Sequence, residues 1–203
     1  PGQPEERRLM VFLRGMGGIS SPAAPGPAGT PQPAPPRAPA QVAPATGTSP
    51  LPALALELKP DGLHIGGRLV TRDELLPVVT GLLGAPTRTN QVMVTGTMVY
   101  AFDQHGVLVY SQPGGGTNSI VLDCEATGGT HGTTAPFAGL LKMEDRAIGP
   151  DMDSAALTAI KELNLQPPSA GGSVWNGRYH GLELIFAYLK SPRRLSLIEI
   201  DLK

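Results

Sequence analysis

Proline is distributed unevenly along this chain, and its distribution limits how much of the chain can form a core. Thirteen of the 22 prolines lie in residues 1–52, mixed with alanine and glycine as in "PAAPGPAGTPQPAPPRAPAQVAPA". Proline lacks the amide hydrogen that helices and sheets need, and such a segment buries too little apolar surface to offset its chain entropy. The sequence therefore predicts a disordered or polyproline-like segment over residues 1–52 and a single folded domain over residues 53–203.

The charge balance argues against nucleic acid as a partner. The chain has 16 basic and 17 acidic side chains, a formal net charge of −1, and no dense basic stripe, whereas binding to phosphates needs clustered cations. The apolar run in "RRLMVFLRGMGG" (residues 7–18) is five residues long, too short for a signal-peptide core or a membrane span. We therefore expect no membrane insertion and a cytoplasmic location. A periplasmic location is the alternative if a leader precedes the first residue, which is proline rather than methionine.

Hydrophobic patterns predict mainly strands after residue 53. Alternating leucines indicate a first strand near residues 54–58, and "GLHIGGRLV" (62–70) indicates a strand, a Gly-Gly turn and a return strand. Three runs rich in β-branched and aromatic residues, "MVTGTMVYAF", "GVLVYSQ" and "TNSIVLDCE", are separated by turn residues and predict an antiparallel meander.

Residues 71–86, "TRDELLPVVTGLLGAP", predict a helix between the hairpin and the meander. Thr71 and Glu74 have the spacing of a capping box. Pro77 would break a hydrogen bond inside a helix, so the helix either starts near Asp73 or is kinked. Its inward face is predicted to consist of Leu75, Val79, Leu82 and Leu83.

The second part of the chain repeats this order. "GLLKMEDRAI" (139–148) is similar to residues 62–70, and "DMDSAALTAIKEL" (151–163) predicts a helix capped by Asp153 or Ser154. Its inward positions are Leu157, Ile160 and Leu163, and strands follow in "SVWNGRYHGLELIFAYL" and "RRLSLIEIDL". The predicted fold class is α+β, with two pseudo-repeated β-β-α-β-β halves, about residues 53–128 and 136–203, forming antiparallel sheets with one helix per half.

Asp103 and His105, in "YAFDQHGVLVY", could form an acid/base pair or half of a metal site. The segment Asp-Gln-His-Gly also has the composition of a turn, in which Asp bonds to backbone amides and Gly106 adopts positive φ. We interpret it as a turn. A composite metal site from Asp123, Cys124 and His131 is the other possibility, but no usual ligand spacing is present, and Cys124 at the end of an apolar strand is typical of a packed thiol. The sequence thus predicts no catalytic residues, no metal and no cofactor.

One aromatic and basic cluster stands out as a candidate protein contact. It consists of Trp175, Asn176, Arg178 and Tyr179. Trp, Tyr and Arg are enriched at protein interfaces, although a single Trp is also common in cores.

Three short motifs carry a resemblance to a known family. They are Leu83, Gly84 and Pro86 after the first helix, Tyr100, Asp103 and Gly106 before an apolar strand, and Pro136, Phe137 and Gly139 at the start of the second half. Together they resemble a bacterial domain family of unknown function that is found among polymorphic-toxin and type VI secretion immunity-type proteins. The resemblance covers about residues 54–203 and implies a non-enzymatic protein that neutralises a cognate toxin by occluding its active site.

A second resemblance points to the cell envelope. A helix that ends in Leu-Gly-x-Pro and is followed by an antiparallel meander is also similar to small outer-membrane assembly lipoproteins. The Pro/Ala-rich segment would then hold the domain away from a membrane. The alternative function is therefore an envelope-tethered structural or interaction module in the periplasm.

Overall fold

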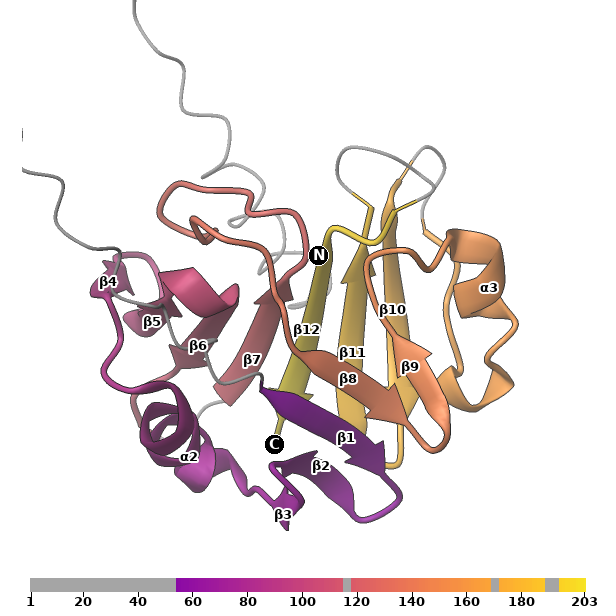
Figure 1. The fold of residues 1–203 in the computed structure, drawn as a ribbon, viewed down its shortest axis with the longest axis horizontal. Helices are drawn as coiled ribbons and strands as arrows, with labels where there is room; N and C mark the ends of the chain where they lie inside the picture. Colours follow the sequence, from indigo (N-terminus) through magenta and orange to yellow (C-terminus); the bar gives the residue numbers. More distant parts are fainter. Residues whose placement is uncertain (1–53, 115–117, 169–171, 189–193) are drawn as a thin grey trace, which may run out of the picture.

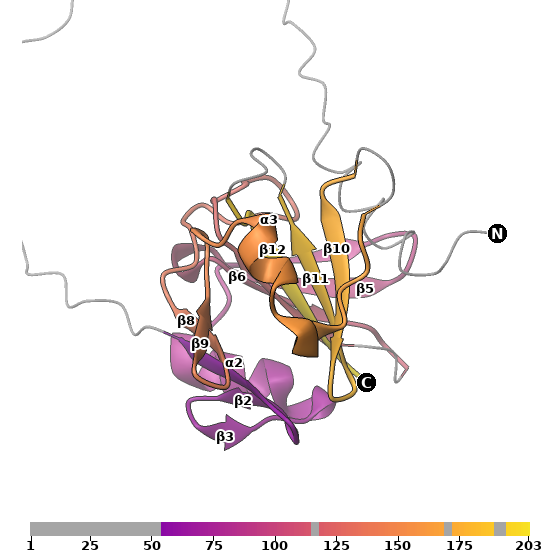
Figure 2. The same ribbon diagram turned by 90° about the vertical axis from the view of Figure 1, so that its right-hand side faces the viewer.

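The computed structural model describes residues 54–114, 118–168, 172–188 and 194–203. Its strands form two sheets that pack on one another, with short helices beside them (Figures 1 and 2). The predicted α+β class is therefore confirmed. The segment predicted to be disordered, residues 1–52, lies outside the described residues.

The first sheet, which we call sheet A, has five strands and contains the predicted hairpin of residues 62–70. Its strand order is β3 (Arg68–Leu69), β2 (Gly62–Ile65), β1 (Ala55–Lys59), β8 (Leu140–Met143) and β9 (Arg146–Ile148). On β1, the side chains that point to the core alternate with exposed or half-buried ones, as the leucine pattern predicts.

The second sheet, sheet B, has seven strands and contains the predicted meander. Its order is β10 (Val174–Tyr179), β11 (Leu182–Ala187), β12 (Leu197–Leu202), β7 (Asn118–Asp123), β6 (Val107–Ser111), β5 (Thr97–Phe102) and β4 (Arg88–Val92). All neighbouring pairs in sheet B are antiparallel.

The first helix, α2 (Leu75–Leu83), follows a 3-10 turn, η1 (Arg72–Glu74). Oε2 of Glu74 accepts hydrogen bonds from the backbone N–H of Thr71, at 3.2 Å, and from its hydroxyl, at 2.8 Å. Pro77 is the third residue of α2 and lies in the first turn, where its missing N–H has no intrahelical partner to lose. The start of the helix therefore accommodates the proline without a kink.

The second predicted helix is shorter than expected. It ends after five residues, as α3 (Ser154–Thr158), and the chain continues into a 3-10 turn, η3 (Lys161–Leu163). Asp153 is its N-cap and accepts a 2.7 Å hydrogen bond from the backbone N–H of Ala156. The inward positions were predicted correctly, because Leu157, Ile160 and Leu163 are all buried.

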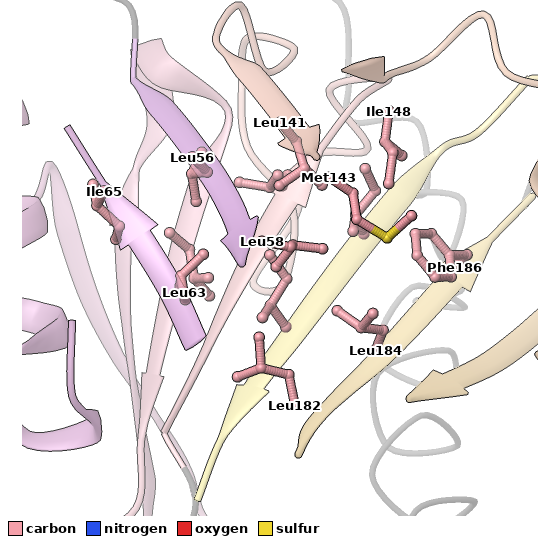
Figure 3. Packing of buried hydrophobic residues seen from close by; sticks show 14 of the residues in the cluster. Leu56, Leu58, Leu63, Ile65, Leu141, Met143, Ile148, Leu182, Leu184 and Phe186 are labelled. Carbon is pink, nitrogen blue, oxygen red and sulfur yellow. The ribbon is translucent and has the colours of Figure 1, made fainter. Parts of the chain in front are cut away.

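The main core lies between the two sheets (Figure 3). Leu56, Leu58 and Leu63 of sheet A face Leu184 and Phe186 of sheet B, and all five are at most 1% exposed. Burial of one such side chain stabilises a fold by about 2 kcal/mol. The cluster runs from Leu54 to Leu202 and joins both predicted halves.

One strand pair departs from the predicted antiparallel sheets. β1 and β8 are parallel, and Leu56 pairs with Leu141 and Leu58 with Met143, all four on the buried face. Two parallel neighbouring strands can be related by a two-fold rotation only about an axis that runs along the strands. Such a rotation would turn the buried face of one strand outward. Because both β1 and β8 keep their buried face inward, no two-fold rotation relates β1–β2 to β8–β9. Among the described strands, four lie between α2 and β8 (β4 to β7), whereas three follow α3 (β10 to β12). The arrangement therefore does not confirm two repeated β-β-α-β-β halves.

Candidate protein-binding surface

The four residues of the predicted contact cluster lie on β10, at one edge of sheet B. Because successive side chains of a strand point to opposite faces, they do not form one surface. Trp175 packs half-buried against the main core, and Tyr179 is 1% exposed within it. Asn176 and Arg178 point to the opposite face, where Arg178 forms an exposed 3.3 Å ion pair with Glu183. The structure thus divides the predicted cluster: two of its residues belong to the core, and the other two lie on the opposite face of the sheet.

Asp103 and His105 belong to a turn, as predicted. Residues Asp103–His105 form a 3-10 turn, η2, that ends at Gly106 with a φ of 68°. The Asp103 carboxylate is nearly buried and accepts hydrogen bonds from Nε of Arg88, at 2.9 Å, and from the Thr87 hydroxyl, at 2.7 Å. Burial alone would raise the pKa of Asp103, but these bonds and the charge of Arg88 outweigh it and lower the pKa. The group is therefore held as a carboxylate with a structural role.

The glycine-rich segment after β7 is anchored by a second carboxylate. Oδ2 of Asp123 accepts hydrogen bonds from the backbone N–H groups and hydroxyls of Thr127 and Thr133, at 2.8 to 3.1 Å. Arg88 donates to the carbonyl oxygens of Thr130, at 3.1 Å, and Gly132. The Asp123 carboxylate, which could bind a metal, and the Arg88 guanidinium, which could bind an anion, are thus both engaged in holding this segment in place.

The composite site of Asp123, Cys124 and His131 does not assemble. Burial raises the pKa of Cys124 to about 12, and the carboxylates of Asp123 and Glu125 act in the same direction. A thiol with this pKa is a poor nucleophile and a poor metal ligand at neutral pH. The ring of His131 instead stacks on Tyr110, with ring centroids 6.4 Å apart. In the described part of the chain, no group of three or more His, Cys, Asp or Glu side chains is placed to bind a metal.

A groove between the β2–β3 hairpin and α2 is a better candidate for a contact site. It has a volume of about 480 Å³. Its lining combines residues of the hairpin with one face of the helix: Ile65, Gly66, Arg68, Glu74, Pro77, Val78, Gly81 and Leu82. Most of this lining is apolar, and Arg68 and Glu74 form an exposed ion pair at it.

One of the residues that line this groove is an exposed leucine. Leu82 is 45% exposed, so its predicted inward orientation is wrong. A Cβ atom placed on Gly66 would lie 3.8 Å from a methyl group of Leu82, which puts the end of α2 against the hairpin turn. An apolar centre with a charged rim is the usual composition of a protein interface. The sequence analysis did not predict this groove. The feature that could have indicated it is the pair of adjacent leucines at the end of α2, which cannot both face the core.

None of the helices in the described part of the chain has the length and apolar character needed to span a bilayer. No curated protein and no solved structure matches the chain. One family model matches residues 55–157, about half of the chain, from β1 into α3, so it includes the groove but not β10–β12. The chain therefore belongs to the family described as Domain of unknown function (DUF7738).

Proposed function

We propose that this chain is a non-enzymatic protein-binding domain that acts as an immunity protein, neutralising a cognate bacterial toxin in the cytoplasm by occluding its active site. The observation that carries the proposal is the groove between the β2–β3 hairpin and α2, which Leu82 lines with a 45% exposed side chain. A concave apolar centre from which a partner can exclude water is the usual core of a protein interface.

The use of the titratable side chains gives further support. Asp103 and Asp123 anchor the chain through hydrogen bonds, and Cys124 is a buried thiol with a raised pKa. Catalytic acids and nucleophiles need access to substrate and a pKa near the working pH. These three groups fit a binding protein better than an enzyme.

The test is binding to the protein encoded beside this gene, measured by isothermal titration calorimetry. Leu82→Asp places a charge at the groove, and we expect it to weaken binding about 30-fold or more, the effect of losing a hot-spot residue. Leu140→Asp is the matched control, since Leu140 is 41% exposed on β8 and does not line the groove. Cells that express the toxin should survive with the wild-type protein and with the control variant.

Failure of every neighbouring gene product to bind would remove the immunity proposal. The alternative is an envelope-tethered interaction module, which the Pro/Ala-rich composition of residues 1–52 favours. Fractionation of cells that express the natural gene separates the two proposals. The protein should remain in the cytoplasmic fraction if it is an immunity protein and appear in the periplasmic or membrane fraction if it is a tethered module.

We also propose that the two halves, about residues 53–128 and 136–203, arose by duplication. Each places a hairpin before a helix and a meander after it, and β7 and β12 are antiparallel neighbours at the centre of sheet B. Superposing β5–β6–β7 on β10–β11–β12 in an experimental structure tests this. A single two-fold rotation should relate these two meanders, although not the hairpins β1–β2 and β8–β9, and any other relation between the meanders contradicts the proposal.

A further inference from the structure

Sheet B has an open edge at β4 (Figure 1). Among the described residues, β4 pairs only with β5, so the backbone groups along its other side have no strand partner. The side chains of its five residues are half-buried or exposed, and none is buried. Unpaired backbone N–H and C=O groups at the edge of a sheet form a template for pairing with another strand.

The other sheet edges in the described part of the chain are short or covered. In sheet A, β3 has two residues and β9 has three, and each strand contains an arginine. In sheet B, the segment before β10 covers the edge of that strand, because the backbone N–H of Gln166 donates to the carbonyl of Asn176 at 2.8 Å. Short strands, charges and covering segments are the usual protection against pairing with another chain.

The open edge at β4 lacks these forms of protection. The sequence contains no charged residue from Thr89 to Phe102, which includes most of β4 and all of β5, and no proline lies in either strand. The charge of Arg88, the first residue of β4, is used by the ion pair with Asp103 and by the carbonyl oxygens of the glycine-rich segment. Nothing in the composition of β4 therefore opposes the addition of a second strand.

We propose that this edge binds the same edge of a second copy of the chain, with the two β4 strands antiparallel about a two-fold axis at Asn90. This register pairs all five residues of the strand. Asn90 lies opposite its own counterpart, and Thr89 lies opposite Gln91. Arg88 lies opposite Val92, so no like charges meet across the contact. The edge is thus complementary to itself, as the interface of a two-fold dimer must be.

The turn after β4 carries apolar side chains that this dimer would cover. Met93 is 87% exposed and Val94 is 86% exposed, more than any other large hydrophobic residue in the described part of the chain. In the proposed register they lie beside the residues that lead into β4 of the second copy, which include Pro86. Burial of these side chains adds to the main-chain hydrogen bonds of the strand pair.

The strand order limits the assembly to two chains. Pairing of the two β4 strands joins two seven-stranded sheets, and the joined sheet ends at β10 on each side. Both ends are covered as they are in a single chain, so among the described residues sheet B then has no open edge for a third copy. The contact is also separate from the proposed toxin-binding groove, since no residue that lines the groove belongs to β4.

Sedimentation equilibrium of the full chain, from low micromolar to millimolar concentration, tests the assembly. The strand contact is small, since five strand residues span about 17 Å, so we expect a weak and reversible dimer. The apparent mass should rise from that of one chain towards that of two. A mass of one chain at every concentration, or growth beyond two chains, would overturn the proposal.

Charges introduced on β4 test the strand and its register. Thr89 and Gln91 are exposed, so their substitution leaves the core intact. In the double variant Thr89→Lys, Gln91→Lys, like charges meet twice across the two-fold axis, and the dissociation constant should rise about tenfold. The matched control Thr89→Lys, Gln91→Glu places opposite charges there, and its dissociation constant should not exceed that of the wild type. Equal dissociation constants of the two double variants would contradict the inference.

Discussion

The ion pair between Arg88 and Asp103 should contribute far more to stability than other pairs of the same length in this protein. Replacing Arg88 by methionine keeps the apolar stem of the side chain and removes its donors. The variant loses hydrogen bonds to both oxygens of Asp103, at 2.9 and 3.0 Å, and to the carbonyl oxygens of Thr130 and Gly132. Asp103 then keeps the hydroxyl of Thr87 as a donor.

The magnitude follows from burial. The side chain of Asp103 is 12% exposed and that of Arg88 is 28% exposed. Removing one partner of a fully buried pair costs about 3 to 5 kcal/mol, and partial access of water to Arg88 places this pair at the lower end. We therefore expect Arg88→Met to lower the free energy of unfolding by about 3 kcal/mol at pH 7.

A lower pH should reduce the difference in the free energy of unfolding between the wild type and Arg88→Met. In the wild type the pKa of Asp103 is lowered below its ordinary value of 3.8, so its contribution to stability is complete above that pH and is lost as the pH falls through the lowered pKa. In the variant, burial without the cation raises the pKa of Asp103, and protonation relieves the cost. The loss caused by Arg88→Met should therefore shrink between pH 7 and pH 3.

Urea denaturation at several pH values measures both effects. Arg194→Met is the control, because Arg194 also lies 2.9 Å from a carboxylate, that of Asp151, but the two side chains are 60% and 89% exposed. Its free energy of unfolding should stay within about 0.5 kcal/mol of the wild type. Equal losses in the two variants, or a loss for Arg88→Met that is independent of pH, would refute the reasoning.

Three further substitutions or measurements follow from the structure. Gly106→Ala should lower the free energy of unfolding, measured by urea denaturation, by more than about 2 kcal/mol, because the new Cβ would lie 2.1 Å from the backbone nitrogen of Phe137. The control is Gly114→Ala, since Gly114 also has a positive φ but has open space around it, and this substitution should cost only about 1 kcal/mol. Cys124, buried and with a pKa of about 12, should resist a maleimide reagent at pH 8 in the native protein and react after unfolding. Asp153→Ala removes the N-cap of α3 and should lower the unfolding free energy by about 1 kcal/mol, seen in the same titration.

The strands that sequence reasoning identified are those with a clear apolar pattern. The strand that it missed, β4, has the sequence Arg-Thr-Asn-Gln-Val and lies at the edge of sheet B, where its side chains alternate between half-buried and exposed. Such a strand is specified by its pairing with β5 rather than by hydrophobicity, so its own residues carry little signal.

The predictions that failed concern contacts between distant segments. Leu82 fits the apolar stripe of α2, and nothing local indicates that the core ends at the β2–β3 turn and leaves it 45% exposed. The early end of α3 has the same origin, since Ile160 leaves the helical conformation, with a ψ of 90°, and is still buried. In both cases packing overrides the local helical preference.

Two of the three motifs that carry the family resemblance, those of Gly106 and of Pro136 to Gly139, meet where the chain crosses from sheet B to sheet A. Gly106 has no side chain at the point where Pro136 and Phe137 pass it, and the backbone N–H of Phe137 donates to the carbonyl of Asp123 at 2.7 Å. The close approach of Gly139 to the carbonyl of Leu54 would exclude a Cβ atom there.

This crossing explains the parallel pair that the sequence pattern could not predict. The backbone N–H of Ala135 donates to the carbonyl of Asp103 at 3.0 Å, and that of Leu140 donates to the carbonyl of Leu54 at 3.0 Å. The connection is thereby fixed to sheet B at one end and to the start of β1 at the other, so β8 begins beside the first residue of β1 and runs in the same direction. The backbone carbonyl of Asp103, whose side chain first suggested chemistry, is one of the anchors that set this direction.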